Sequence, residues 1–337
     1  RNGDLVHKMY LEVDITIANG VDDLCTRLGH NMIDYVEIEI GGQLIDKQYG
    51  QWMDIWSQLS NTKEQFKKLD HMITGDNFLS HMDDFSAGRA GTYKFYVPLQ
   101  FWFNRNPGLA LPLIALQYHE VKLNIKLNRL TDLSNTSNAL TLSDITLYCD
   151  YIFLDTDERR RFAQVSHEYL IEQVQFNGNV TSDTSVGTGT QVRSIDLRFN
   201  HPCKEIVWVA GPARTHKTFN KYSSGSQTEH ITDVKLELNG HDRFTSRSGS
   251  YFKGVQTYQH HTGGYMDKSH DNEHLGGIYC YSFALRPEEH QPSGTCNFSR
   301  IDNSVLSLTM KATGDSNRVV SVYAINYNVL RIMSGMG

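Results

Sequence analysis

The feature that most constrains the fold of this chain is an internal repeat. Residues 33–42 read IDYVEIEIGG, and 198 positions later residues 231–240 read ITDVKLELNG. Of these ten positions, four are identical and two exchange Ile for Leu. Apolar residues occupy every second position before a turn, which predicts a strand with one buried face and one solvent-facing side.

The order of features is also the same in the two halves. Aromatic residues follow each turn, including Trp52 in the first half and Phe252 in the second, and each half ends in a tyrosine-rich strand, at residues 147–153 and 322–327. Chance could explain one pair of similar strands, but the repeated order favours duplication. We therefore predict two copies of one β unit, at residues 1–156 and 165–337, joined by a short helical linker at 157–164.

Other segments show the same alternation of apolar and polar residues, at 11–17, 121–127, 195–199 and 305–310. Many short strands separated by Gly, Asn, Asp and Ser clusters are typical of an antiparallel sandwich or barrel. The composition agrees, because 17 Tyr and 15 Phe with only 7 Pro suit pleated, half-buried surfaces.

Few segments have helical periodicity. Residues 49–59 place Trp52, Ile55, Trp56 and Leu59 on one face, which predicts an amphipathic helix. The linker is predicted to be helical because Asp155 and Glu158 have the spacing of a capping box, with Phe162 and Val165 on a shared inner face.

Charge and cysteine content exclude several classes of protein. The chain has 337 residues, and 32 basic against 38 acidic side chains give a net charge of −6, which argues against direct binding of nucleic acid. No apolar run is long enough to span a membrane as a helix. The five cysteines are widely spaced and are predicted to be reduced thiols. Since the sequence begins at Arg1, we expect further chain upstream of it.

Motifs of catalysis and cofactor binding are missing. We find no nucleophile elbow, phosphate-binding loop, zinc-protease helix or complete dinucleotide fingerprint, and therefore predict no catalytic residue, cofactor site or metal site. A bicupin metal barrel needs a His-x-His pair, and none of the 15 histidines forms one. Two further polar groups are interpreted as surface loops and turns: His260, His261, His270 and His274, and the pair Glu288 and Glu289.

Three asparagines lie in glycosylation sequons, at Asn135, Asn179 and Asn297. Such triplets are common by chance and are used only in some compartments, so these positions are only possible acceptors. The run Arg159 to Arg161 is expected to form a solvated face or an interface.

Four long segments carry a specific resemblance. Residues 33–50, 97–121, 154–169 and 281–302 resemble the major capsid proteins of nucleocytoplasmic large DNA viruses, of the algal-virus and iridovirus kind. The resemblance extends over nearly the whole chain. It implies an all-β fold of two tandem eight-stranded antiparallel jelly rolls.

The resemblance also implies a function. It suggests a structural subunit, without enzymatic activity, that forms pseudo-hexameric homotrimers tiling an icosahedral shell, assembled in the host cytoplasm. Expected partners are other copies of the chain and penton and minor capsid proteins, with the internal membrane contacted only indirectly. Residues 101–119 and 286–301 would lie near the trimer contacts, and an N-terminal arm is expected before Arg1.

A second function class stays open, because jelly rolls also form glycan-binding proteins. In such a protein the loop aromatics would stack on sugar rings. The candidates are Tyr251, Phe252, Tyr258 and Tyr265.

Overall fold

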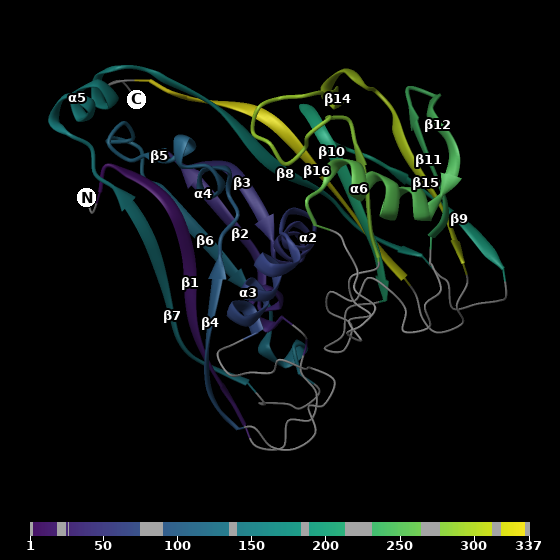
Figure 1. Cartoon of the computed structure of the whole chain (residues 1–337), viewed down its shortest axis with the longest axis horizontal. Coiled ribbons are helices and arrows are strands. Elements are labelled where there is room, and N and C mark those ends of the chain that lie inside the picture. The colour runs from purple at the N-terminus through teal and green to yellow at the C-terminus, as the bar shows by residue number, and fades with distance from the viewer. Residues whose placement is uncertain are drawn as a thin grey trace. The chain divides into compact units, whose positions relative to one another are not determined.

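The computed structural model describes residues 3–18, 25, 27–74, 90–134, 140–182, 189–212, 231–263, 277–311 and 318–333 (Figure 1). The chain forms two compact units. Unit 1 comprises residues 1–53, 67–173 and 327–337, and unit 2 comprises residues 54–66 and 174–326. The predicted boundaries at 156 and 165 stay a prediction, since this division assigns short stretches of each half to the other unit.

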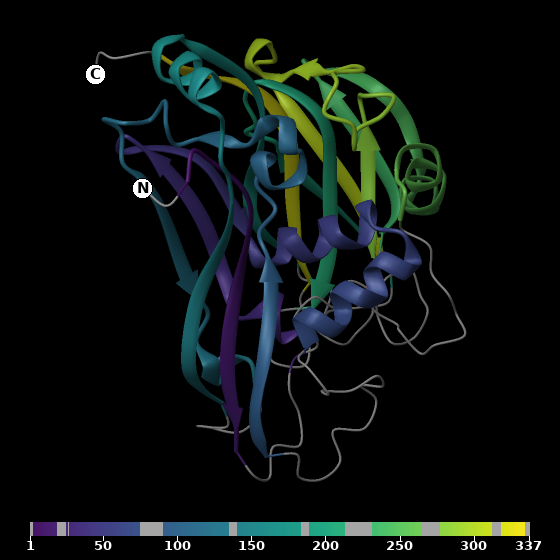
Figure 2. The ribbon, with the colours of Figure 1, turned by 60° about the vertical axis from the view of Figure 1, so that its left-hand side comes forward.

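Unit 1 contains two antiparallel sheets. In the first sheet, β1 (Leu5–Ile17) lies between β4 (Gly91–Pro98) and β7 (Leu140–Ile152) and also pairs with the short β5 (Leu111–Pro112) (Figure 2). In the second sheet, β2 (Ile33–Ile40) lies between β3 (Gln43–Tyr49) and β6 (Val121–Leu127). The strands predicted by alternation in this half are confirmed.

The alternation sets the two faces of β1. Its apolar residues Leu11, Val13 and Ile15 are almost fully buried. Glu12 and Asp14 point to the other face, where both carboxylates pair with the Lys94 ammonium group of the neighbouring strand β4. One face of the sheet thus packs in a core while the other carries charge.

Unit 2 repeats this arrangement. Its first sheet has the order β13 (Ile278–Ser282), β10 (Pro202–Pro212), β16 (Arg318–Ile332), β8 (His167–Ser182), with the short β14 (Cys296–Asn297) paired to β10. The second has the order β12 (His241–Ser248), β11 (Ile231–Leu238), β15 (Ser304–Lys311), β9 (Thr190–Asp196). The predicted strand at 195–199 is only partly correct, because β9 ends at Asp196.

The sequence repeat corresponds to a repeated hairpin. The β2–β3 turn has positive φ at Gly41 (59°) and Gly42 (80°), and the β11–β12 turn has positive φ at Asn239 (52°) and Gly240 (76°). Two central residues with positive φ define the type I′ turn, whose twist suits a tight hairpin. Each hairpin also has a register shift immediately before the last glutamate of its first strand. The shift lies between Ile38 and Glu39 in unit 1 and between Leu236 and Glu237 in unit 2.

The two predicted helices are present. Helix α2 (Gly50–Ser60) buries Trp52, Ile55, Trp56 and Leu59 as the periodicity indicated. Helix α5 (Thr156–Gln164) begins after Asp155, whose carboxylate accepts hydrogen bonds from two backbone N–H groups of the first turn. The predicted inner face is wrong at Val165, which lies beyond the helix and is 49% exposed.

Other helices were not predicted. The longest is α3 (Lys63–Thr74), and η3 (Tyr251–Val255, a π-helix) continues into α6 (Gln256–His260). The short ones are α1 (Leu28–Asn31), α4 (Trp102–Arg105), η1 (Pro107–Leu109), η2 (Leu130–Asp132) and η4 (Phe298–Arg300). No helix in the described ranges is long and apolar enough to cross a membrane. All five cysteines are free thiols, as predicted.

Candidate functional site

The two predicted sequon asparagines that the structure describes lie on different strands, β8 and β14. Asn135 is outside the described residues. Asn179 is exposed on β8, where its side-chain oxygen accepts a hydrogen bond from the Ser321 hydroxyl at 2.7 Å. Asn297 is half-buried and caps η4 by accepting from the Ser299 backbone N–H at 3.1 Å. Their use as glycan acceptors stays a prediction.

The three described aromatic residues among those proposed for sugar stacking do not share a surface. Phe252 is fully buried against Trp208 and Phe244, and Tyr251 packs under the guanidinium group of Arg247. Tyr258 is 89% exposed, while Tyr265 is outside the described residues. The described part of the chain therefore offers one exposed ring of the four, and no stacking platform.

The two described histidines of the group predicted from the sequence, His260 and His261, have different partners. His270 and His274 lie outside the described residues, and the His260 ring contacts the Leu285 carbonyl oxygen at 3.1 Å. His261 instead points into unit 2, where its side chain is fully buried. There it meets two carboxylates and a thiol that the sequence gives no reason to group.

Strand β10 positions the first of these carboxylates. The strand is buried on both faces, since Ile206, Val207, Trp208 and Val209 are each at most 1% exposed. A register shift between Cys203 and Glu205 interrupts its pairing with β16. Such a bulge re-aims a side chain, and here Glu205 is placed inside the unit with no exposed surface.

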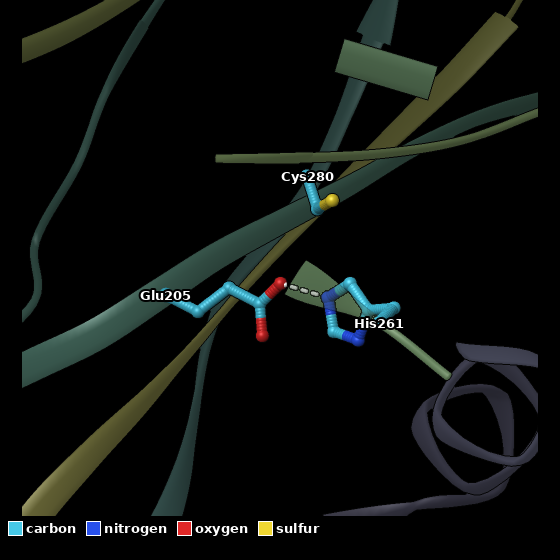
Figure 3. A group of neighbouring side chains, drawn as sticks. All are labelled: Glu205, His261 and Cys280. Carbon is cyan, nitrogen blue, oxygen red and sulfur yellow. Dashed lines mark hydrogen bonds and ion pairs between the residues drawn. The ribbon is translucent and has the colours of Figure 1, made fainter. Parts of the chain in front are cut away.

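His261 lies between two carboxylates. It directly follows α6, and its imidazole Nε2 is 2.5 Å from Glu205 Oε1 (Figure 3). Its Nδ1 is 3.0 Å from Glu288 Oε1. Glu288 also accepts hydrogen bonds from the backbone N–H and the hydroxyl of Thr262. The ring of Trp56 lies edge-on to the imidazole at 6.5 Å between centroids.

Cys280 completes the cluster from β13. A ligand atom from each of Glu205, His261 and Cys280 lies within 4.8 Å of the other two. The thiol donates to the Phe252 carbonyl oxygen at 3.7 Å. We call Glu205, His261, Cys280 and Glu288 the buried cluster.

The buried cluster shifts the protonation of its members. Burial opposes a charge on His261, but the Glu205 carboxylate and hydrogen bonds from the cluster raise its pKa well above the usual value. Burial also works against the charge on Glu288, yet hydrogen bonds from His261 and Thr262 lower the pKa of that carboxyl. Burial raises the pKa of the Cys280 thiol to about 11. A buried imidazolium between two carboxylates is a structural ion-pair arrangement.

Large apolar side chains are exposed on both units. In unit 2, Val255 and Tyr258 lie one helical turn apart, and the segment carrying Leu285 (74% exposed) is tied to α6 through the His260 ring. We call these three residues the α6 patch. Grouped apolar residues of this kind mark interaction surfaces more often than isolated ones do.

In unit 1, the exposed residues follow strand β7. Its core-facing Ile145 and Leu147 are each over a third exposed, and Tyr148 on the other face stacks on Tyr10 at 5.2 Å between centroids. Among the described strands, β7 pairs with β1 alone. A long edge strand with exposed apolar side chains is a site at which another chain can associate. We call Ile145 and Leu147, which share one face of the strand, the β7 patch.

The chain has two β units, each with two antiparallel sheets, and each unit carries an exposed apolar patch. These features are typical of a double jelly-roll protein of the kind that builds capsids. Comparison with solved structures supports this class. The chain matches a crystal structure of PBCV-1 VP54, fitted into a reconstruction of the virophage Sputnik, with a TM-score of 0.82 and 36% identity over 100% of this chain and 90% of that one. A Faustovirus major capsid protein matches with a TM-score of 0.72 at 12% identity, covering 98% of this chain and 86% of that one, which shows the shared fold.

Sequence comparison identifies the family. The model for large eukaryotic DNA virus major capsid proteins matches residues 158–337, and the model for the major capsid protein N-terminus matches residues 1–155. The major capsid protein of Pyramimonas orientalis virus is 46% identical over all of this chain and 83% of its own length. That of Paramecium bursaria Chlorella virus 1 is 38% identical over all of this chain and 85% of its own length.

The chain therefore belongs to the major capsid proteins of large eukaryotic DNA viruses. It is a structural protein of the virion capsid, with the double jelly-roll fold that the resemblance predicted. The family and the double jelly-roll fold class are confirmed, and eight strands in each roll stay a prediction.

Proposed function

We propose that the chain self-assembles into homotrimeric, pseudo-hexameric capsomers that tile the icosahedral shell, and that it has no enzymatic activity. The observation that carries this proposal is the pair of different apolar patches, one on each unit. A closed trimer needs heterologous contacts, in which one surface of a subunit meets a different surface of the next. The α6 patch and the β7 patch differ from one another and lie on different units, which supports contacts of this kind.

Duplication of the unit supports the pseudo-hexameric shape. Three chains of two similar units present six similar units around the trimer axis, which suits a hexagonal lattice. The fold class and the repeated β2–β3 and β11–β12 hairpins support two such units. The matches of the two family models, to residues 1–155 and 158–337, support jelly rolls at residues 1–156 and 165–337 with a linker at 157–164.

The remaining parts of the proposal concern partners and location. We propose penton and minor capsid proteins as further partners, no direct contact with nucleic acid, only indirect contact with the internal membrane, and assembly in the host cytoplasm. The net charge of −6 supports the lack of nucleic-acid contact, since a genome-binding surface is strongly basic.

The test is assembly of the purified chain. Sedimentation at micromolar concentration should give the mass of three chains, and negative-stain images should show hexagonal particles. The double variant Tyr258→Asp with Leu285→Asp should sediment as a monomer, because it places charge in the α6 patch. Leu44→Asp is the matched control, since Leu44 is an exposed leucine outside both patches. A wild-type chain that stays monomeric would refute the proposal.

A further inference from the structure

We propose that Glu205, His261 and Cys280 form a binding site for a borderline-soft divalent cation, of which Zn²⁺ is the best fit. The three residues supply carboxylate, imidazole and thiol ligands, and one atom of each lies within 4.8 Å of the others (Figure 3). Zinc sites use this set of donor atoms, whereas Mg²⁺ and Ca²⁺ prefer oxygen alone. The proposal does not depend on trimer formation.

Glu288 gives the site its second feature. It accepts from His261 Nδ1 at 3.0 Å and is itself held by Thr262. In metal sites a carboxylate at one imidazole nitrogen fixes the ring so that the other nitrogen faces the metal. Here the other nitrogen, Nε2, faces Glu205 and lies near the Cys280 thiol.

Glu205 also has an unused ligand atom. Its Oε2 is buried and has no hydrogen-bond partner among the described residues. A buried carboxylate oxygen without a partner is costly in free energy, and a coordinated cation would remove that cost. The side chains of Glu205 and His261 are fully buried, so the ion would be acquired while the chain folds.

Charge balance permits a divalent cation to replace two protons of the buried cluster. In the metal-free cluster, two carboxylates and one imidazolium give a net charge of −1. Binding of Zn²⁺ releases one proton from His261 Nε2 and one from the Cys280 thiol, so the cluster again carries −1. No uncompensated charge is therefore created inside unit 2.

Geometry requires a small rearrangement. Zinc–nitrogen and zinc–oxygen bonds of about 2.0–2.2 Å in a tetrahedron separate the two ligand atoms by about 3.3–3.5 Å. Nε2 and Oε1 are 2.5 Å apart with the proton between them. These two atoms must move apart by about 1 Å. Rotation of the Glu205 side chain can supply this movement.

The experiment uses the full chain, expressed with and without added Zn²⁺ and then dialysed against metal-free buffer. Mass spectrometry of the metal content should give one zinc per chain. Expression with Co²⁺ should give the thiolate-to-cobalt charge-transfer absorption that reports a Cys ligand. Cys280→Ser should abolish that absorption, whereas Cys203→Ser, at another buried thiol outside the buried cluster, should retain it.

Two further outcomes separate the metal site from a simple ion pair. Glu288→Gln keeps all three ligands and should weaken metal binding by about 10–100-fold. Wild-type chain with no zinc and no cobalt absorption would overturn the proposal and leave the cluster as a buried ion pair only. Metal that persists in folded Cys280→Ser and His261→Gln chains would overturn it as well, because the ion would then lie elsewhere.

Discussion

Gly249 offers the sharpest test of a close backbone contact that occurs in each of the two units. It directly follows β12, and a Cβ atom built there would lie 2.1 Å from the Ile231 carbonyl oxygen. Gly50 follows β3 in the same way, and its Cβ would lie 2.2 Å from the Ile33 carbonyl oxygen. In each unit, the residue that follows the hairpin thus lies against the backbone of the first residue of the hairpin's first strand.

Gly249→Ala should therefore strongly destabilise the protein. The contact is with backbone, so no flexible side chain can move away, and a normal separation requires a shift of about 1 Å in a strand or in the chain after it. We expect a loss of about 3 kcal/mol, at the upper end of the range for overpacking. For a unit of this size, that corresponds to a fall in melting temperature of about 6–12 °C.

The assay is thermal unfolding followed by calorimetry at one fixed protein concentration, since assembly makes the melting temperature depend on concentration. Gly254→Ala is the control, because a Cβ there meets nothing within 4 Å and the residue is helical. It should be neutral or stabilise by up to about 1 kcal/mol. If Gly249→Ala and Gly254→Ala melt at the same temperature, the close approach of Gly249 to Ile231 is not a real constraint.

Three more substitutions test separate parts of the fold. Asp155→Ala removes the N-cap of α5 and should cost about 1 kcal/mol, measured by urea unfolding. Glu172→Gln weakens the largely buried pair in which Arg105 Nη2 lies 2.9 Å from Glu172 Oε2, and should cost about 2 kcal/mol, whereas Glu168→Gln, at an exposed pair, should change the urea midpoint little. Trp208→Ala empties the core of unit 2 and should cost about 4 kcal/mol, seen as a lower midpoint with an unchanged slope.

The strands could be predicted from sequence because alternation records burial directly. From Val36 in β2 and throughout β15, every second residue is buried, so the pattern and the structure contain the same information. Helix α3 was missed although its start carries a signal. Thr62 and Gln65 form a capping box, with the Gln65 N–H donating to the Thr62 hydroxyl at 3.3 Å, but the charged residues that follow obscure the apolar face.

The buried cluster could not be predicted. Its members are 8 to 56 positions apart between neighbours in the sequence. Glu205, His261 and Cys280 meet only because β10, β13 and the residue after α6 pack together in unit 2. No local spacing brings a residue at 205 to one at 261. The signal that was available is weaker: an acidic residue at the start of the apolar run IVWVA must find a partner if that run is buried.

A comparison of the central strands of the two units shows why the run IVWVA in β10 is buried on both faces. In unit 1, β1 alternates, and its charged residues Glu12 and Asp14 lie on the outer face. In unit 2, β10 is continuously apolar from Ile206 to Ala210, and both of its faces are buried. The central strands β1 and β10 have equivalent partner strands. The two units therefore differ in whether protein covers the outer face of that central strand.

Covering that face creates the need for the buried cluster. Within unit 2, Trp56 packs against the His261 ring and the Gly263 N–H donates to the Leu59 carbonyl oxygen at 2.7 Å, so two distant segments close over β10. A carboxylate that would be solvated on β1 becomes enclosed at Glu205 and requires a compensating cation. His261 supplies one as an imidazolium, and the adjacent thiol makes a metal ion the other chemically consistent solution.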